Sequence, residues 1–208
     1  MSAAYQTCPA PGGRELTARA LTLAGLRRHG RVLDIGCGSG GTVDWLRRCH
    51  RFQAFGLDCS RARFQTGVPL LQAQAERLPF ASATLDGVLA ECSLSVTASQ
   101  DAALAECARV LVRGGKLLLT DVYARNPVVG MIQREELMGQ LAAHDFRVLC
   151  WEDHSEVLRT FLARYIFEHG STGQLWAGPC GLGEAVQQVR PGYFLLVAEA
   201  QGARTNGR

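Results

Sequence analysis

Short apolar runs alternate with amphipathic stretches along most of this 208-residue chain. The apolar runs are rich in β-branched and aliphatic residues, which is typical of buried strands. The amphipathic stretches repeat apolar residues every three or four positions, as one face of a helix does. The expected strands are 31–35, 52–57, 70–73, 85–91, 116–122, 146–151 and 193–198. The expected helices are 14–26, 42–48, 61–66, 98–111, 134–144 and 156–168.

This order of elements predicts an α/β fold, a doubly wound and mostly parallel sheet with helices on both faces. No internal repeat or linker-like composition divides the chain, so we expect a single domain over residues 1–200. The polar tail, 201–208, is expected to be disordered. Ligands of such sheets bind beyond the carboxyl ends of the strands. We therefore look for site residues just after the first four strands.

The composition excludes several classes of protein. Apolar residues make up 47% and charged residues 20%, as in ordinary globular domains. No apolar run approaches the roughly 18 residues of a membrane span. The first ten residues lack the layout of a signal peptide, so we expect a cytoplasmic protein. The net charge is only +3, and the two small arginine clusters near 27–31 and 47–51 are more typical of helix ends than of nucleic-acid binding.

The cysteines and histidines do not form a recognisable framework. Eight cysteines and five histidines are scattered along the chain without a Cys-x-x-Cys or His-x-His pair. Without a secretory signal, reduced thiols are the favoured interpretation. We expect neither disulfides nor a bound metal.

The most informative segment joins the first strand to the next helix and reads Val-Leu-Asp-Ile-Gly-Cys-Gly-Ser-Gly-Gly over residues 32–41. Glycines allow a ligand to approach the backbone closely, and a helix N-terminus favours anionic groups. The pattern Gly-x-Gly-x-x-Gly, with Asp58 about twenty residues beyond, also fits a dinucleotide fingerprint. Asp34 favours a different ligand, because its carboxylate would repel a pyrophosphate and attract a positive charge.

With this loop, the chain resembles the class I S-adenosylmethionine-dependent methyltransferases, in particular the small-molecule group related to the quinone-biosynthesis enzymes (methyltransferase type 11). The resemblance extends over about residues 11–199 and rests on four segments in the family's order. It implies a Rossmann-like methyltransferase fold with seven strands, the last of them antiparallel. The four segments are 32–40, 56–58, 75–88 and 109–117.

By position, the resemblance implies S-adenosylmethionine as the cofactor. The loop from Asp34 would hold its methionine part, Asp58 would accept from both ribose hydroxyls, and Glu91 would lie beside the substrate entrance. Gln74 departs from the aspartate usual in the family, which leaves an uncharged acceptor for the adenine. The implied cofactor-binding residues are Asp34, Gly36, Cys37, Gly38, Ser39, Gly40, Asp58, Cys59, Gln74, Ala75 and Glu91.

The expected activity is methyl transfer to a small-molecule acceptor that the sequence does not identify. The acceptor site is expected under residues 155–190 and the N-terminal segment. Neither a general base nor the oligomeric state can be inferred. Two alternatives stay open, a catalytically silent cofactor-binding protein and, less favoured, a NAD-dependent oxidoreductase. Candidate acceptor-lining residues are Tyr5, Cys92, Tyr123, Tyr165 and Trp176.

Overall fold

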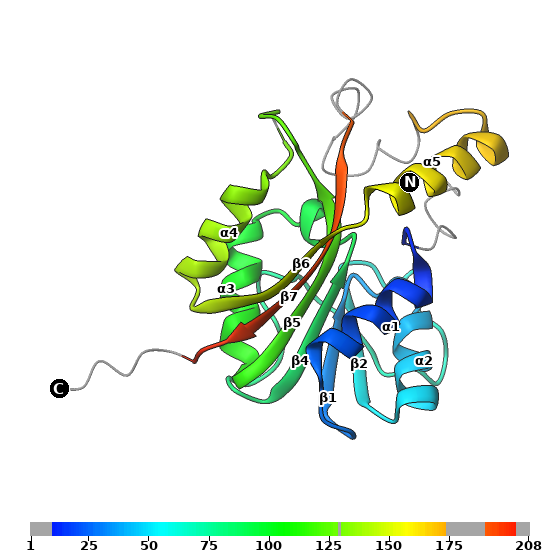
Figure 1. The fold of residues 1–208 in the computed structure, drawn as a ribbon. Helices are drawn as coiled ribbons and strands as arrows, with labels where there is room; N and C mark the ends of the chain where they lie inside the picture. The colour runs from blue at the N-terminus through cyan, green and yellow to red at the C-terminus, as the bar shows by residue number, and fades with distance from the viewer. Residues whose placement is uncertain (1–9, 129, 174–189, 203–208) are drawn as a thin grey trace.

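The computed structural model describes residues 10–128, 130–173 and 190–202. A seven-stranded sheet runs through the molecule with helices on both sides (Figure 1). Its order is β3-β2-β1-β4-β5-β7-β6, and only β7 runs antiparallel to its neighbours. This confirms the predicted α/β fold with an antiparallel last strand. The strands are β1 (Arg31–Ile35), β2 (Gln53–Asp58), β3 (Leu70–Gln72), β4 (Leu85–Glu91), β5 (Leu111–Tyr123), β6 (Phe146–Asp153) and β7 (Gly192–Ala200).

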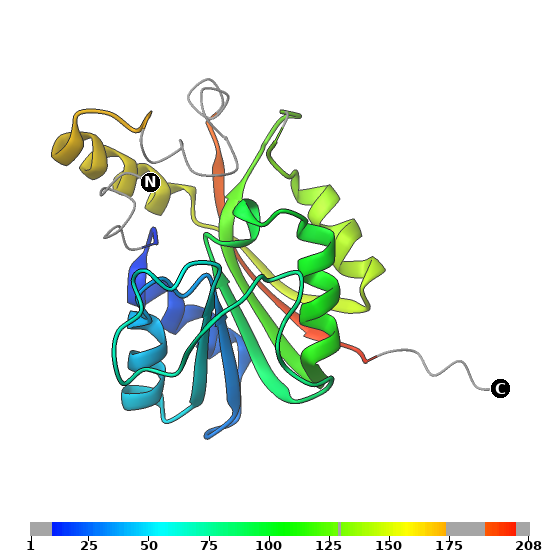
Figure 2. The same ribbon diagram turned by 180° about the vertical axis from the view of Figure 1, so that it is seen from behind.

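The helices cover the two faces of the sheet in pairs. Strand side chains alternate between the faces: Val32 packs with residues of α1 and α2, whereas Leu33 packs with residues of α3 and α4. Figure 2 shows the face covered by α3, which appears in green. The helices are α1 (Gly13–Ala24), α2 (Gly41–His50), α3 (Gln100–Val110), α4 (Arg134–Ala143) and α5 (Ser155–His169), with a short 3-10 helix, η2 (Leu94–Val96).

The prediction of a helix at 61–66 is wrong, because this segment consists of turns. Its amides do not continue a helical ladder. The amide of Gln65 instead donates a hydrogen bond to the carbonyl of Ser39, in the glycine loop, at 3.3 Å. An amide bonded to a distant loop takes no part in a helical ladder.

The fifth strand also begins earlier than predicted. Leu111 already pairs with Leu85, and pairing resumes where Lys116 lies beside Gly87. The residues between these pairs form an irregularity in the strand. The residues between the end of α3 and the predicted strand thus form a bulge within β5.

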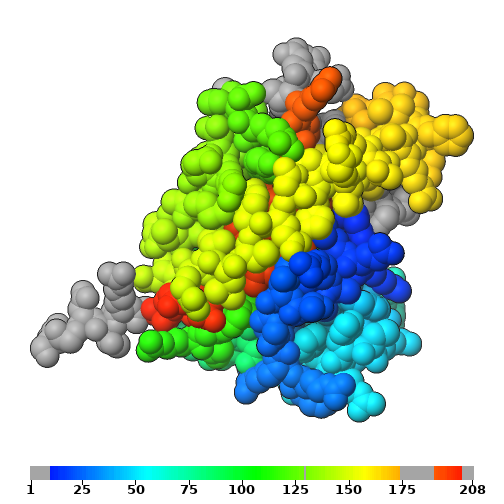
Figure 3. Space-filling model, in the orientation of Figure 1, coloured from blue at the N-terminus to red at the C-terminus, as the bar shows by residue number. Residues whose placement is uncertain are grey.

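Helix α5 lies at the end of the sheet where the ligand is expected. β6 runs parallel to β1, so α5 starts at the carboxyl edge of the sheet. It buries Leu158 and Tyr165, whereas Phe167 is 92% exposed. Figure 3 shows α5 projecting beyond the sheet, with β6 in yellow across the front. Among the described residues, no helix is long and apolar enough to cross a membrane.

Candidate functional site

The glycine loop after β1 has a backbone that only glycine fits without strain. Gly36 has a φ of 75°, and a Cβ added there would lie 2.4 Å from the Cβ of Ser93. Gly40 has a φ of 88° and precedes the first residue of α2, and an added Cβ would lie 2.8 Å from Leu70. The lack of room for a Cβ shows that the loop lies close to β3 and to the turn after β4. The spacing of glycines seen in the sequence therefore follows from both backbone conformation and lack of room.

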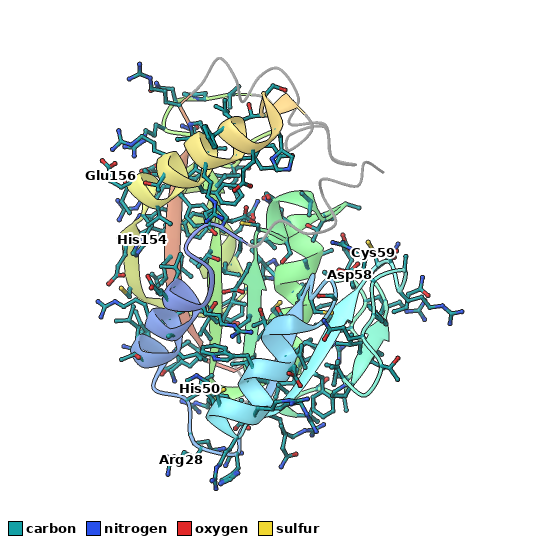
Figure 4. All side chains as sticks on the ribbon, turned by 90° about the vertical axis from the view of Figure 1, so that its right-hand side faces the viewer. Arg28, His50, Asp58, Cys59, His154 and Glu156 are labelled. Carbon is teal, nitrogen blue, oxygen red and sulfur yellow. The ribbon has the colours of Figure 1, made fainter. Side chains whose placement is uncertain are left out.

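Asp58 holds the glycine loop from the neighbouring strand. Its Oδ2 accepts the amide of Gly38 at 2.9 Å, and its Oδ1 accepts the amide of Ser60 at 2.9 Å. The residue is only 7% exposed. Each carboxylate oxygen keeps a further acceptor position for a ligand hydroxyl. Figure 4 shows Asp58 and Cys59 together at the end of β2, well away from Arg28 and His50.

Asp34 is a buried carboxylate without a hydrogen-bond donor among the described residues. It is 3% exposed, and no group within the described ranges donates a hydrogen bond to it. Burial, followed by the charges of Glu91 and Asp58, raises the pKa of Asp34 well above its usual range. An ionised carboxylate in this position is costly unless a cation compensates it. The residue therefore fits a ligand that carries a positive charge.

Glu91 lies close to Asp34 and is held by helix α1. The hydroxyl of Thr17 lies 2.6 Å from Glu91 Oε1. Burial raises the pKa of Glu91, and the hydrogen bond from Thr17 opposes that shift. Sequence reasoning missed Thr17, although a polar residue among the buried positions of an amphipathic helix was a usable signal.

The loop after β3 lies beside the end of β2. The amide of Ala73 donates a hydrogen bond to the carbonyl of Asp58 at 3.1 Å. Beyond it, Gln74 is exposed and Ala75 is buried in the core. Cys59 is also exposed, and its carbonyl accepts from the side chain of Gln72 at 3.2 Å. The predicted adenine-side residues are thus brought to the same edge.

Two residues of α3 anchor the following segment. Glu106 accepts the amide of Leu78 at 2.7 Å. Arg109 donates to the carbonyls of Leu78 and Phe80 at 3.1 and 2.8 Å, and it pairs with Glu106 at 2.6 Å. Neither residue was identified from the sequence, since the contacts join segments far apart in the chain.

Cys37 packs within the fold, and Ser39 accepts the amide of Gln65 through its carbonyl. The Cys37 thiol lies against Gly56, where an added Cβ would be 2.7 Å away. Burial raises the pKa of this thiol, so the thiol stays protonated. Within the described part of the chain, no group of three or more His, Cys, Asp or Glu side chains could hold a metal ion.

The candidate acceptor residues do not all gather in one place. The thiol of Cys92 lies 3.2 Å from the hydroxyl of Tyr193, on the α1 face of the sheet. Tyr123 belongs to the core on the opposite face, and its hydroxyl lies 3.2 Å from Asp153. Tyr165 is a buried residue of α5, and its ring stacks on His169 of the same helix. Tyr5 and Trp176 lie outside the described residues.

Comparisons with known proteins agree with this arrangement. Residues 33–119 match a family model described as a methyltransferase domain. A fatty-acid O-methyltransferase of Mycolicibacterium smegmatis is 38% identical over 104 residues, which cover 46% of this chain and 38% of that protein. The O-methyltransferase resE of Aspergillus sclerotiorum is 31% identical over 173 residues, which cover 70% of this chain and 64% of that protein. The chain thus spans less than two thirds of either relative.

Among solved structures, the [4+2]-cyclase SpnF superimposes with a TM-score of 0.75 and 25% identity, over 90% of this chain and 80% of that one. The family match covers the segment that holds Asp34, Asp58 and Glu91. It also confirms the resemblance inferred from the sequence. The sheet order, the glycine loop and these matches together show that the chain is similar to the class I S-adenosylmethionine-dependent methyltransferases.

Proposed function

We propose that this protein transfers a methyl group from S-adenosylmethionine to a small-molecule acceptor. S-adenosylmethionine is the cofactor of the family. Asp34 carries the proposal, because it is buried, lacks a hydrogen bond from the described residues and lies beneath the glycine loop. A cofactor that bears an ammonium and a sulfonium would compensate this carboxylate. A pyrophosphate would be repelled by it.

The residues at the carboxyl edge match the parts of this cofactor in order. Asp34 and the loop from Gly36 to Gly40 would hold the methionine part. Asp58 would accept from the ribose hydroxyls, since each of its oxygens has only one backbone donor. Cys59 and the loop containing Gln74 and Ala75 would line the adenine.

The protein's main contribution to the chemistry would be alignment. The bound cofactor supplies a methyl group that is already activated by the positive sulfur. Holding an acceptor atom in line with that methyl group can supply about 7–11 kcal/mol of barrier lowering. Helix α5 and α1 would shield the site, because Val157 approaches Gly12 where the two helices meet.

Calorimetry with S-adenosylmethionine and with NAD tests the cofactor assignment. We expect binding of S-adenosylmethionine alone, and we expect Asp34→Asn to weaken it by about tenfold or more, or about 1.4 kcal/mol. Asp44→Asn is the matched control, since Asp44 is paired with Arg48 on the outside of α2. Binding of NAD in place of S-adenosylmethionine would instead support the oxidoreductase alternative.

A catalytically silent cofactor-binding protein is the second candidate. The structural neighbour SpnF is named as a cyclase, so the fold is not restricted to methyl transfer. Incubation with methyl-labelled cofactor and a metabolite extract separates the two candidates. Label recovered in a small molecule supports the enzyme, whereas tight cofactor binding without transfer to any acceptor supports the silent protein.

A further inference from the structure

A row of polar side chains interrupts the apolar face of the sheet beneath α1. On this face the strands otherwise present core residues such as Val32, Leu89 and Leu118. Alternation along the strands puts Asp34, Glu91 and Thr120 on the same face. In the sheet, Asp34 pairs with Leu89, and Glu91 pairs with Thr120. The row therefore crosses β1, β4 and β5 at their carboxyl ends. Tyr193, at the start of β7, continues it on the same face.

Two carboxylates of this row have oxygens available to a ligand, and with Asp34 assigned to the cofactor, Glu91 is the one left for the acceptor. Its Oε1 is taken by the Thr17 hydroxyl at 2.6 Å. No donor among the described residues reaches its Oε2, and the residue is partly exposed at the last position of β4. The chain turns sharply just beyond, where Cys92 has a φ of 50°. The free oxygen therefore lies where the family's ligands bind.

The surroundings of Glu91 are acidic or neutral. Asp34 faces it from β1, and Thr17 faces it from α1. Cys92 follows it in the chain, Thr120 lies opposite on β5, and Tyr193 is buried on β7. No cationic side chain contributes to the pKa shift of Glu91 or Asp34 among the described residues. Outside them, the only basic residues are two arginines of the C-terminal tail.

These observations select one kind of acceptor. We propose that Glu91 Oε2 accepts the proton of an uncharged hydroxyl acceptor, and that Thr17 positions the carboxylate for this task. The inference rests on the proposed function. The O–H bond breaks and its proton passes to Glu91, while the oxygen's electron pair forms the bond to the methyl carbon. The carbon–sulfur bond breaks with its electrons left on sulfur, and Glu91 later returns the proton to water.

The same charges disfavour a carboxylate acceptor. The bound cofactor's ammonium would compensate Asp34, but an anionic acceptor would still approach the Glu91 carboxylate, and no cationic side chain among the described residues contributes to the pKa shift of Glu91. A hydroxyl group brings no charge and offers a donor to Glu91. Burial raises the pKa of Glu91, which brings it nearer to the working pH and makes it a better base. This class differs from the acceptor in the name of the fatty-acid O-methyltransferase relative.

Single-turnover transfer from labelled cofactor to paired probes tests the proposal. The pairs are phenol with benzoate and 1-decanol with decanoate. We expect label in the hydroxyl members only, and a rate for Glu91→Gln lower by about 10²-fold or more. Glu15→Gln is the matched control, because Glu15 is an exposed acid on α1 close to Thr17 in sequence. Label in the carboxylates, in neither class, or in the hydroxyl members at an unchanged rate for Glu91→Gln would overturn the proposal.

Calorimetry with S-adenosylhomocysteine gives a readout besides activity. We expect Glu91→Gln to change its Kd by less than about threefold, since the proposal places Glu91 against the acceptor. A loss of tenfold or more would assign Glu91 to the cofactor and overturn the proposal, while methyl transfer as the function would stand. Failure of the unaltered protein to bind the cofactor at all would overturn the proposed function itself.

The role of Thr17 is tested by a pair of substitutions. Thr17→Val removes the hydroxyl with little change of shape, and it should lower the transfer rate about tenfold and shift the pH profile of the rate upward. Thr17→Ser keeps the hydroxyl and should restore both. Equal behaviour of the two variants would show that Thr17 only fills space.

Discussion

The carboxylate of Asp58 accepts the backbone amide of Gly38 across 2.9 Å, so the second strand holds the loop that follows the first. Its other oxygen accepts the amide of Ser60 at the same distance. One buried side chain thus shapes the two turns that we propose bind the cofactor. These two contacts tie the glycine loop and the turn at Ser60 to the end of β2.

Replacing Asp58 with asparagine should loosen both turns. The amide side chain presents one donor where the carboxylate had a second acceptor, so one backbone N–H loses its partner. We expect a loss of about 1–3 kcal/mol in the free energy of unfolding, measured by urea denaturation. Asp44→Asn is the control, since an exposed ion pair contributes at most about 1 kcal/mol. Equal losses in the two variants would contradict this role of Asp58.

Replacing Gly36 with alanine should be costly for two reasons that can be separated. Its φ is 75°, and the new Cβ would lie 2.4 Å from Ser93. Gly67→Ala serves as control, because Gly67 has a similar φ of 84° but open space around it. We expect a loss of about 1 kcal/mol for the control and about 2–4 kcal/mol for Gly36→Ala. Adding Ser93→Gly should recover part of the difference, and no recovery would rule out the steric cause.

Replacing Asp34 with asparagine should stabilise the cofactor-free protein at neutral pH. The raised pKa of Asp34 means that the folded state binds its proton more tightly than the unfolded chain, so stability is lost as pH rises above about 3.8. A neutral amide is cheaper to bury than a carboxylate, and we expect a gain of about 1–2 kcal/mol. The gain should shrink as pH falls toward 3.8. Denaturation curves at several pH values check this, and a gain independent of pH would contradict it.

Replacing Glu106 with alanine should release the segment after β3. The amide of Leu78 loses its acceptor, and Arg109 loses its paired charge. We expect a loss of about 1–3 kcal/mol in the free energy of unfolding, together with faster hydrogen exchange at Leu78. Asp101→Ala on the same helix is the control, because its contact with His144 is exposed. Unchanged exchange at Leu78 would show that the segment is held by other contacts.

Much of the cofactor edge could be predicted from the sequence because it depends on local order. A strand that ends in spaced glycines, and an acidic residue at the end of the next strand, define their geometry over a few residues. Parallel strands then bring Asp34, Asp58 and Glu91 to one edge, whatever the details of packing. The element order was sufficient for the mostly parallel sheet, whereas the antiparallel last strand was predicted from the family resemblance.

Contacts between distant segments were decided only by the tertiary structure. The hydroxyl of Thr17 meets Glu91 because α1 packs against β5 and β7 and reaches the end of β4, a placement that apolar spacing within α1 does not specify. The face on which Tyr123 lies depends on the register of β5, and residues 61–66 form turns in which the amide of Gln65 bonds to Ser39. The sequence alone determined the fold and the cofactor edge, since both follow from short-range pattern. The surroundings of the proposed acceptor site were decided by packing. There the interacting groups come from different elements, and no local sequence pattern predicts the distance between them.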